Sequence, residues 1–284
     1  MLLTLCVKSI RSLIQDAEDP IALSDVPAFV RDSLGLRGLS LSTDLLKGAT
    51  RSDLESLRDR ADKVACSCLL LEDPDPLPFS SADATKAEMA IDRTRRVLQA
   101  AQILGCNSAA VRIDAPDDDQ AADRVVENMR TAVDFAERLE VNLLIAPCEG
   151  LTQTADRVTD LLKRIGGFRI GTLPDFGQAA ASSDAVTYLR RLTPYASVVI
   201  ATTREFDTLE ELAPDEVLDV EDLLVERAPV HTSYDLGPMV EAVISVGFDI
   251  TLSINYEGKG DPVLGSLASR AALRQAIEKA REKD

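Results

Sequence analysis

The sequence predicts an α/β protein, a single (β/α)8 TIM barrel that occupies residues 1–284. Short runs of apolar or β-branched residues alternate with longer amphipathic segments, and this alternation repeats eight times without a linker. Strands that alternate with helices form parallel sheets, and eight such units in about 250 residues close into a barrel. A doubly wound sheet is the second candidate, but residues 7–12 lack the glycine-rich loop that it needs after its first strand.

The expected strands are rich in apolar and β-branched residues, and the expected helices carry apolar residues three and four positions apart. Residues 121–139 illustrate the helical spacing, with Val125, Met129, Ala132 and Ala136 on one face. We expect strands at residues 4–7, 38–42, 65–71, 108–114, 142–146, 168–173, 197–201 and 249–254. We expect helices at residues 23–34, 52–63, 86–104, 121–139, 155–165, 185–192, 236–246 and 267–281.

Two segments do not follow the alternation of strands and helices. Pro74, Pro76 and Pro78 predict a stiff loop after the third strand. Residues 204–230 are long, acidic and flanked by proline, so we expect an extended acidic loop or insertion near the barrel mouth.

The composition restricts the class of protein. The net charge of −17 disfavours nucleic acid as a partner, because an acidic surface repels phosphate groups. No apolar run approaches the roughly 20 residues of a membrane span, which predicts no membrane association. The five cysteines include no Cys-x-x-Cys pair, which favours reduced thiols and a cytoplasmic location. A homo-oligomer is left open.

Residues 166–177 (Gly-Gly-Phe-Arg-Ile-Gly-Thr-Leu-Pro-Asp-Phe-Gly) and 252–262 (Leu-Ser-Ile-Asn-Tyr-Glu-Gly-Lys-Gly-Asp-Pro) each join an expected strand to a polar loop. Together with residues 104–114 and 231–243, they follow one another in an order that resembles the xylose isomerase-like sugar phosphate isomerase and epimerase family. The resemblance covers nearly the whole chain. It implies a TIM barrel, a carbohydrate or sugar phosphate as the small-molecule partner, and proton transfer next to a carbonyl.

The resemblance also implies a divalent metal held by residues at the ends of the fifth to eighth strands. At the matching positions the chain has Ala146, Asp175, Ile200 and Asn255, so Asp175 is the one matching ligand. Divalent cations prefer several carboxylate or imidazole ligands, so the resemblance implies a degenerate metal site. We therefore expect no cofactor. Manganese, zinc or magnesium would bind only if displaced carboxylates such as Glu149 and Glu257 replaced the missing ligands.

Several other polar residues are candidates for the site. Asp175 is the candidate catalytic acid or base, with helix capping as the alternative. Arg112 alternates with apolar neighbours on the fourth strand and is expected to bind a ligand anion or to form a salt bridge inside the barrel. Asn255, Glu257 and Lys259 follow the last strand and are candidates for binding substrate, with surface or barrel-end roles as alternatives.

Three further polar residues, Asp114, His231 and Cys148, are weaker candidates for the site. Asp114 shares the strand face of Arg112 and is expected at the interior or the rim of the barrel. His231, the single histidine, is expected to be a solvated or capping residue in a loop. Cys148 has no basic neighbour in sequence and is expected to be an inert thiol.

Three functions remain open from the sequence. The first is a sugar or sugar phosphate isomerase or epimerase, with Asp175 as the surviving acid. The second is a non-catalytic carbohydrate-binding or regulatory relative that has lost its metal. The third is a metal-independent lyase or isomerase that uses Arg112 and a displaced carboxylate.

Overall fold

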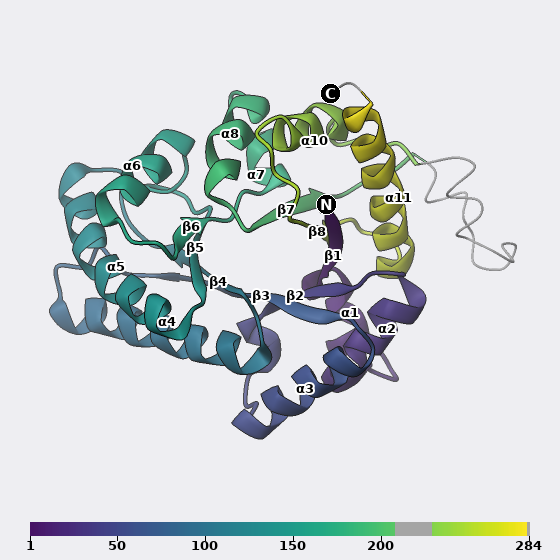
Figure 1. The fold of residues 1–284 in the computed structure, drawn as a ribbon, viewed down its shortest axis with the longest axis horizontal. Coiled ribbons are helices and arrows are strands. Elements are labelled where there is room, and N and C mark those ends of the chain that lie inside the picture. Colours follow the sequence, from purple (N-terminus) through teal and green to yellow (C-terminus); the bar gives the residue numbers. More distant parts are fainter. Residues whose placement is uncertain (208–228, 283–284) are drawn as a thin grey trace, which may run out of the picture.

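The computed structural model describes residues 1–207 and 229–282 and shows a ring of parallel strands surrounded by helices (Figure 1). This arrangement confirms the predicted (β/α)8 barrel. The strands of the described ranges are β1 (Leu2–Cys6), β2 (Gly38–Ser42), β3 (Ser67–Leu77), β4 (Ser108–Ile113), β5 (Asn142–Ala146), β6 (Ile170–Thr172), β7 (Val198–Thr203) and β8 (Thr251–Tyr256).

The strands form one sheet in the order β6-β5-β4-β3-β2-β1-β8-β7. The two ends of this sheet meet between β6 and β7 without a continuous ladder. Within the described residues, the backbone pairing at this junction consists of the isolated bridges Thr172–Ala196 and Asp175–Ile200, with the Ile200 amide donating to the Pro174 carbonyl at 2.8 Å. We call this junction the β6–β7 seam.

The helices lie outside the ring (Figure 1). Those of the described ranges are α1 (Arg11–Gln15), α2 (Val26–Ser33), α3 (Arg51–Lys63), α4 (Ala84–Leu104), α5 (Asp119–Leu139), α6 (Ala155–Ile165), α7 (Phe176–Ala181), α8 (Ala185–Leu192), α10 (Leu236–Ile244) and α11 (Pro262–Arg281). The short helices α1 and α7 were not predicted. Helix α11 begins five residues earlier than expected, because Asp261 accepts hydrogen bonds from two amides of the first turn and Pro262 suits the first helical position.

The prediction that Pro74 and Pro76 lie in a loop was wrong, because β3 continues to Leu77. The pairing of β3 with β4 shifts register between Glu72 and Pro76 and then resumes. This irregularity accommodates the prolines, which cannot donate ladder hydrogen bonds. It also extends β3 toward the mouth of the barrel.

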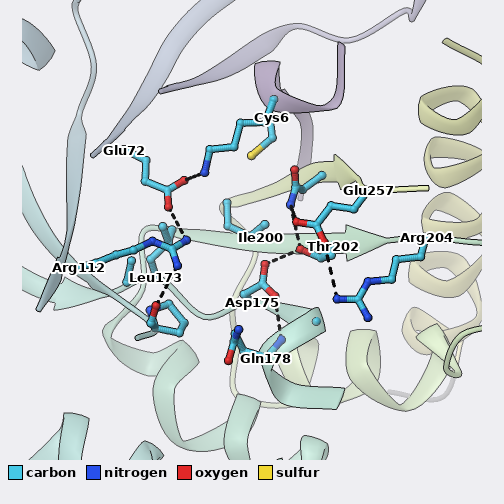
Figure 2. Close-up of a pocket in the computed structure, with 15 residues that line it drawn as sticks. Cys6, Glu72, Arg112, Leu173, Asp175, Gln178, Ile200, Thr202, Arg204 and Glu257 are labelled. Carbon is cyan, nitrogen blue, oxygen red and sulfur yellow. Dashed lines mark hydrogen bonds and ion pairs between the residues drawn. The ribbon is translucent and has the colours of Figure 1, made fainter. Parts of the chain in front are cut away.

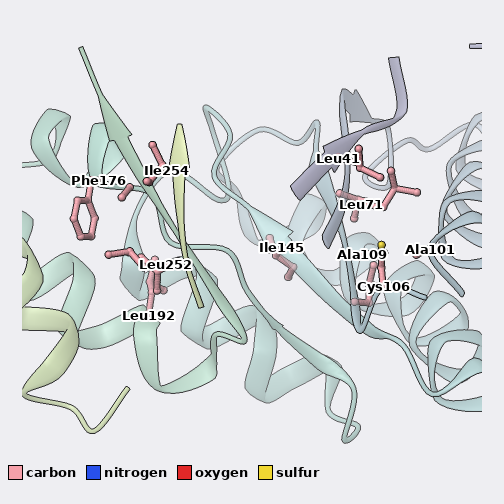
Figure 3. Packing of buried hydrophobic residues seen from close by; sticks show 14 of the residues in the cluster. Leu41, Leu71, Ala101, Cys106, Ala109, Ile145, Phe176, Leu192, Leu252 and Ile254 are labelled. Atoms are coloured by element: carbon pink, nitrogen blue, oxygen red, sulfur yellow. The ribbon is translucent and has the colours of Figure 1, made fainter. Parts of the chain in front are cut away.

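Alternate residues of the strands build two separate cores. Residues such as Leu71, Ala109, Ile145, Leu252 and Ile254 pack against the helices in the outer core (Figure 3). The barrel interior contains a smaller apolar cluster of Cys6, Leu70, Ala110, Leu144, Ala146, Leu173, Val198 and Ile200. Ser40 and Ser253 add a buried hydroxyl pair, 2.9 Å apart, beside Cys6 of this cluster. The charged side chains of the cavity described below lie toward the carboxyl ends of the strands.

The predicted acidic loop at 204–230 lies mainly outside the described residues, which resume at residue 229. Within the part of the chain that the structure describes, no helix is both long enough and apolar enough to cross a bilayer.

Candidate functional site

A cavity of about 150 Å³ opens at the carboxyl ends of the strands (Figure 2). Ala146, Asp175, Ile200 and Asn255, which stand at the four ligand positions implied by the family resemblance, all line it. The remaining lining residues are Cys6, Lys8, Glu72, Arg112, Pro147, Leu173, Gly177, Gln178, Thr202, Arg204 and Glu257. This end of the strands is where parallel barrels build their functional sites.

One wall of the cavity is a partly buried ion-pair cluster of Lys8, Glu72 and Arg112, of which Glu72 is the buried member. Lys8 follows β1 in a 3-10 helix (Val7–Ile10), and its Nζ lies 2.6 Å from Glu72 Oε2. Arg112 Nη2 lies 2.8 Å from Glu72 Oε1, and Arg112 Nη1 donates to the Pro147 carbonyl at 3.3 Å. A single carboxylate therefore bridges two cations. Burial by itself raises the pKa of Glu72, but Lys8 and Arg112 outweigh this effect and hold that pKa below its ordinary value.

The other wall is a hydrogen-bonded chain from Asp175 to Arg204. Thr202 Oγ1 donates to Asp175 Oδ2 at 2.5 Å and accepts from Asn255 Nδ2 at 3.1 Å. Asn255 Nδ2 also donates to Glu257 Oε1 at 3.0 Å, and Glu257 Oε2 lies 3.7 Å from Arg204 Nη2. Thr202 and Asn255 face each other because they are paired across β7 and β8.

Asp175 has the most perturbed carboxyl group of this wall. It follows β6 and caps α7, with Oδ1 accepting from the Gln178 amide at 2.9 Å. Burial raises the pKa of Asp175 to about 6, although hydrogen bonds from Thr202 and Gln178 act in the opposite direction. A carboxyl with this pKa exchanges its proton near neutral pH, as general acids and bases do.

The donor set at this cavity does not fit a divalent metal ion. Ala146 and Ile200 offer no ligand atom, and both oxygens of Asp175 already accept hydrogen bonds. The Lys8 and Arg112 cations line the same space and repel a further positive charge. Among the described residues, no three His, Cys, Asp or Glu side chains are grouped closely enough to share a metal.

The other predicted site residues lie in two kinds of position, either lining the cavity or exposed outside it. Arg112, Asn255 and Glu257 line the cavity, as the sequence led us to expect. Lys259 and Glu149 are exposed and do not line it. The structure therefore brings Glu257, but neither Glu149 nor Lys259, beside Asp175. Asp114, which was expected at the interior or the rim of the barrel, follows β4 and is exposed, so it does not lie in the interior.

His231 was expected to be solvated or capping, and the solvated alternative was wrong. Only 6% of this residue is exposed, and its ring contacts those of Phe206 and Tyr234 edge-on. Nε2 accepts from the Arg204 amide at 2.9 Å, so Nδ1 carries the proton and donates to the Tyr234 carbonyl at 2.7 Å. His231 lies outside the cavity lining and fixes the backbone of a cavity residue, Arg204.

Sequence reasoning missed Lys8, Glu72, Thr202 and Arg204. Glu72 lies two residues beyond Leu70, a member of the interior cluster, so strand alternation contained a signal for an inward carboxylate. The prolines that follow it obscured this signal. Lys8 and Arg204 each lie just beyond a strand, where sequence alone does not define the direction of the side chain.

Cys148 is half-buried, and burial is the largest of the effects that raise the pKa of its thiol. Cys6, which lines the cavity, is buried, and burial raises its thiol pKa to about 12. Both thiols are therefore protonated at neutral pH, and neither adds a thiolate to the charges of the site.

The fold and the position of the cavity define an α/β barrel with a site at the carboxyl ends of its strands. Residues 32–282 match the family model described as xylose isomerase-like TIM barrel. The chain belongs to this family, whose fold is that of sugar epimerases and isomerases.

Solved structures share this fold at low sequence identity. The structure of an L-ribulose 3-epimerase matches with a TM-score of 0.77 and 16% identity, covering 100% of this chain and 97% of that chain. A D-psicose 3-epimerase from Clostridium cellulolyticum H10 matches with a TM-score of 0.70 and 13% identity, covering 99% of each chain. The IOLI protein, solved with a zinc atom, has a TM-score of 0.66 and 14% identity over 100% of this chain and 97% of that chain. No curated protein matches the sequence.

Proposed function

We propose that the cavity binds a small polyhydroxylated carbonyl compound of the sugar class, and that the protein moves a proton at a carbon next to the carbonyl without a divalent metal. Asp175 is the proposed proton-carrying group. The observation that supports this proposal is the position of its carboxyl group, which lines the cavity at the end of β6 and has a pKa of about 6. Membership of the xylose isomerase-like family supports the substrate class.

The polar groups beside Asp175 suit a polyhydroxylated ligand. Thr202, Asn255 and Gln178 offer hydroxyl and amide groups, and Glu257 offers carboxylate oxygens. Such groups exchange hydrogen bonds with water for hydrogen bonds with ligand hydroxyls, which fixes the orientation of a sugar. The Ile200 and Leu173 side chains form an apolar floor that limits the depth of binding.

In place of a metal, the Lys8 and Arg112 cations would hold the carbonyl oxygen and stabilise the negative charge that develops there when the proton leaves. Preorganised cations perform this electrostatic role in many active sites. The shared carboxylate of Glu72 fixes both cations in position.

One observation favours a second candidate, a carbohydrate-binding protein without catalysis. Both oxygens of Asp175 accept hydrogen bonds, and one of them caps α7, which is a structural role. In that case the same cavity binds the ligand and no proton moves.

Deuterium exchange separates the two candidates. The purified protein is incubated in heavy water with a panel of pentoses, hexoses and their ketoses, with and without added manganese, and deuterium at carbon is measured by NMR. We expect exchange with one compound class without metal, lost in Asp175→Asn. Binding in a thermal-shift assay without exchange would support the non-catalytic candidate.

Asp184→Asn is the matched control, because Asp184 caps α8 with the same backbone hydrogen-bond pattern and lies outside the cavity lining. This variant should keep the full exchange rate. Elemental analysis gives an independent check: zinc, manganese or magnesium bound stoichiometrically and released by Asp175→Ala would overturn the metal-free proposal.

A further inference from the structure

We propose that the ligand of this cavity is a sugar acid. Its carboxylate supplies the carbonyl oxygen that Lys8 and Arg112 hold, and its hydroxyls bind the wall that contains Asp175 and Asn255. The inference rests on the proposed function, since it takes the ligand to be polyhydroxylated, and it adds the ionic group that selects among such compounds.

The charges of the Lys8–Glu72–Arg112 wall do not cancel. Glu72 offers one negative charge to two cations, with contacts of 2.6 Å to Lys8 Nζ and 2.8 Å to Arg112 Nη2. Cys6 lies beside them as a neutral thiol and adds no compensating charge. The wall therefore has one positive charge in excess, in a protein whose net charge is −17.

Hydrogen-bond donors on this wall also exceed the acceptors. An ammonium and a guanidinium together have eight N–H groups. In the part of the chain that the structure describes, Glu72 and the Pro147 carbonyl accept from them, and Arg112 Nε is buried without a partner. A ligand with two acceptor oxygens on one carbon would meet this surplus, and a carboxylate has that geometry.

The opposite wall has the reverse character. Asp175 and Glu257 face Arg204, so carboxylates outnumber cations, and the 3.7 Å contact of Arg204 with Glu257 lies at the exposed rim. An anionic group is repelled from this wall, whereas hydroxyl groups can donate to its oxygens. The cavity thus distinguishes the two ends of a ligand, with a carboxylate at Lys8 and Arg112 and hydroxyls at Asp175.

The size of the excess charge favours a carboxylate over a phosphate. One excess positive charge balances a monoanion, whereas a phosphate monoester carries about −1.5 to −2 charges near neutral pH. A neutral sugar leaves the excess uncompensated. The carboxylate of an aldonic or uronic acid therefore fits this wall best.

Isothermal titration calorimetry tests the inference with matched ligands. Pentonates and hexonates are titrated beside the corresponding alditols, which have the same hydroxyl pattern without the carboxylate, and beside hexose 6-phosphates. We expect at least one aldonate to bind at least tenfold more tightly than its alditol and than the phosphates. Equal affinity for an aldonate and its alditol, or tighter binding of the phosphates, would overturn the sugar-acid inference.

Charge variants locate the binding group. Arg112→Gln should weaken aldonate binding at least tenfold and leave alditol binding unchanged, and Arg112→Lys should restore most of the lost affinity. Lys8→Met provides an independent variant if Arg112→Gln does not fold, as judged by circular dichroism. An aldonate affinity unchanged by these substitutions contradicts the inference.

Arg164→Gln is the control for net charge, since Arg164 forms exposed ion pairs with Asp123 and Asp160 on the outer helices. It should change no affinity. Alditols that bind equally well to the wild type and to Arg112→Gln, with no preference for aldonates, would overturn the inference and leave the proposed function standing. Absence of binding by every ligand in this panel would overturn the sugar-acid inference, whereas the deuterium-exchange experiment with neutral sugars decides the proposed function separately.

Discussion

Thr202 donates its hydroxyl hydrogen to Asp175 across the β6–β7 seam, with 2.5 Å between Thr202 Oγ1 and Asp175 Oδ2. The seam lacks a continuous ladder, so this side-chain bond joins the two strand ends beside the isolated bridge of Asp175 with Ile200. Asp175 therefore takes part both in closing the barrel and in lining the cavity. Substitution of Asp175 should therefore affect both the stability of the protein and the properties of the cavity.

Asp175→Asn should change the pH dependence of stability. Because burial raises the pKa of Asp175 to about 6, the folded state binds the proton more tightly than the unfolded state does. Stability is therefore lost as pH rises from about 4 through about 6, a difference of about 1 to 3 kcal/mol. The variant, whose amide still caps α7, should lack this loss in urea unfolding measured across that range.

Asp184→Asn is the control, because the pKa of Asp184 is shifted in the opposite direction to that of Asp175. Hydrogen bonds from Thr187 lower the pKa of Asp184, so its contribution is present at neutral pH and is lost as the medium becomes acidic. Matching pH profiles for the two variants would contradict the assignment of a raised pKa to Asp175.

Glu72 and Arg112 should be energetically coupled. Their side chains are 7% and 32% exposed, and removing Glu72 leaves the Lys8 and Arg112 cations side by side without their shared carboxylate. A double-mutant cycle of Glu72→Gln and Arg112→Gln should give a coupling energy of about 1 to 3 kcal/mol in urea unfolding. The more exposed pair of Arg164 with Asp160 is the control and should give below about 0.5 kcal/mol. Equal values for both pairs would show that the ion-pair cluster is not specially coupled.

His231 should titrate below the ordinary histidine range. Burial is the main cause that lowers its pKa, so the folded state disfavours the imidazolium form. Stability is lost as pH falls below about 6.5, where the unfolded imidazole gains its proton. Because the chain has a single histidine, one set of imidazole NMR signals reports this titration. A midpoint at or above the value measured for the protein in urea would refute the expected direction.

Gly150→Ala should be unusually destabilising. Gly150 has a φ of +84°, and an added Cβ would lie 2.3 Å from the Ala115 carbonyl oxygen, which accepts from the Leu151 amide. Overpacking costs about 1 to 3 kcal/mol beyond the cost of the left-handed backbone. Gly247→Ala shares a positive φ of +79° but meets no atom within 4 Å, and should cost about 1 kcal/mol. Similar melting temperatures for the two variants would contradict the close approach at Gly150.

The fold was predictable because its signals are local and repeated. Apolar runs defined the strands, and the spacing of Val125, Met129, Ala132 and Ala136 places them together on the buried face of α5. Errors arose where two local signals conflict. Pro74 and Pro76 indicate a loop, but pairing with β4 holds them in an irregular strand.

The cavity was predictable in position and only partly in composition. Asp175, Asn255 and Arg112 line it as expected, since strand ends converge in a parallel barrel. Lys8 and Glu72 are 64 positions apart in sequence, and their contact depends on how β1 and β3 curve around the same interior. The burial of His231 likewise depends on the ring of Phe206, 25 positions earlier in the sequence, in addition to that of the nearby Tyr234.

The β6–β7 seam has a consequence for motion in the barrel. The other neighbouring strands pair directly as parallel ladders, with register shifts between β2 and β3 and between β3 and β4, and separating them requires several backbone hydrogen bonds to break together. At the seam the two strand ends are linked by isolated bridges and by the Thr202–Asp175 hydrogen bond. Local opening takes the least free energy where the fewest backbone hydrogen bonds must break, so we expect the barrel wall to open most readily beside Asp175, at the edge of the cavity.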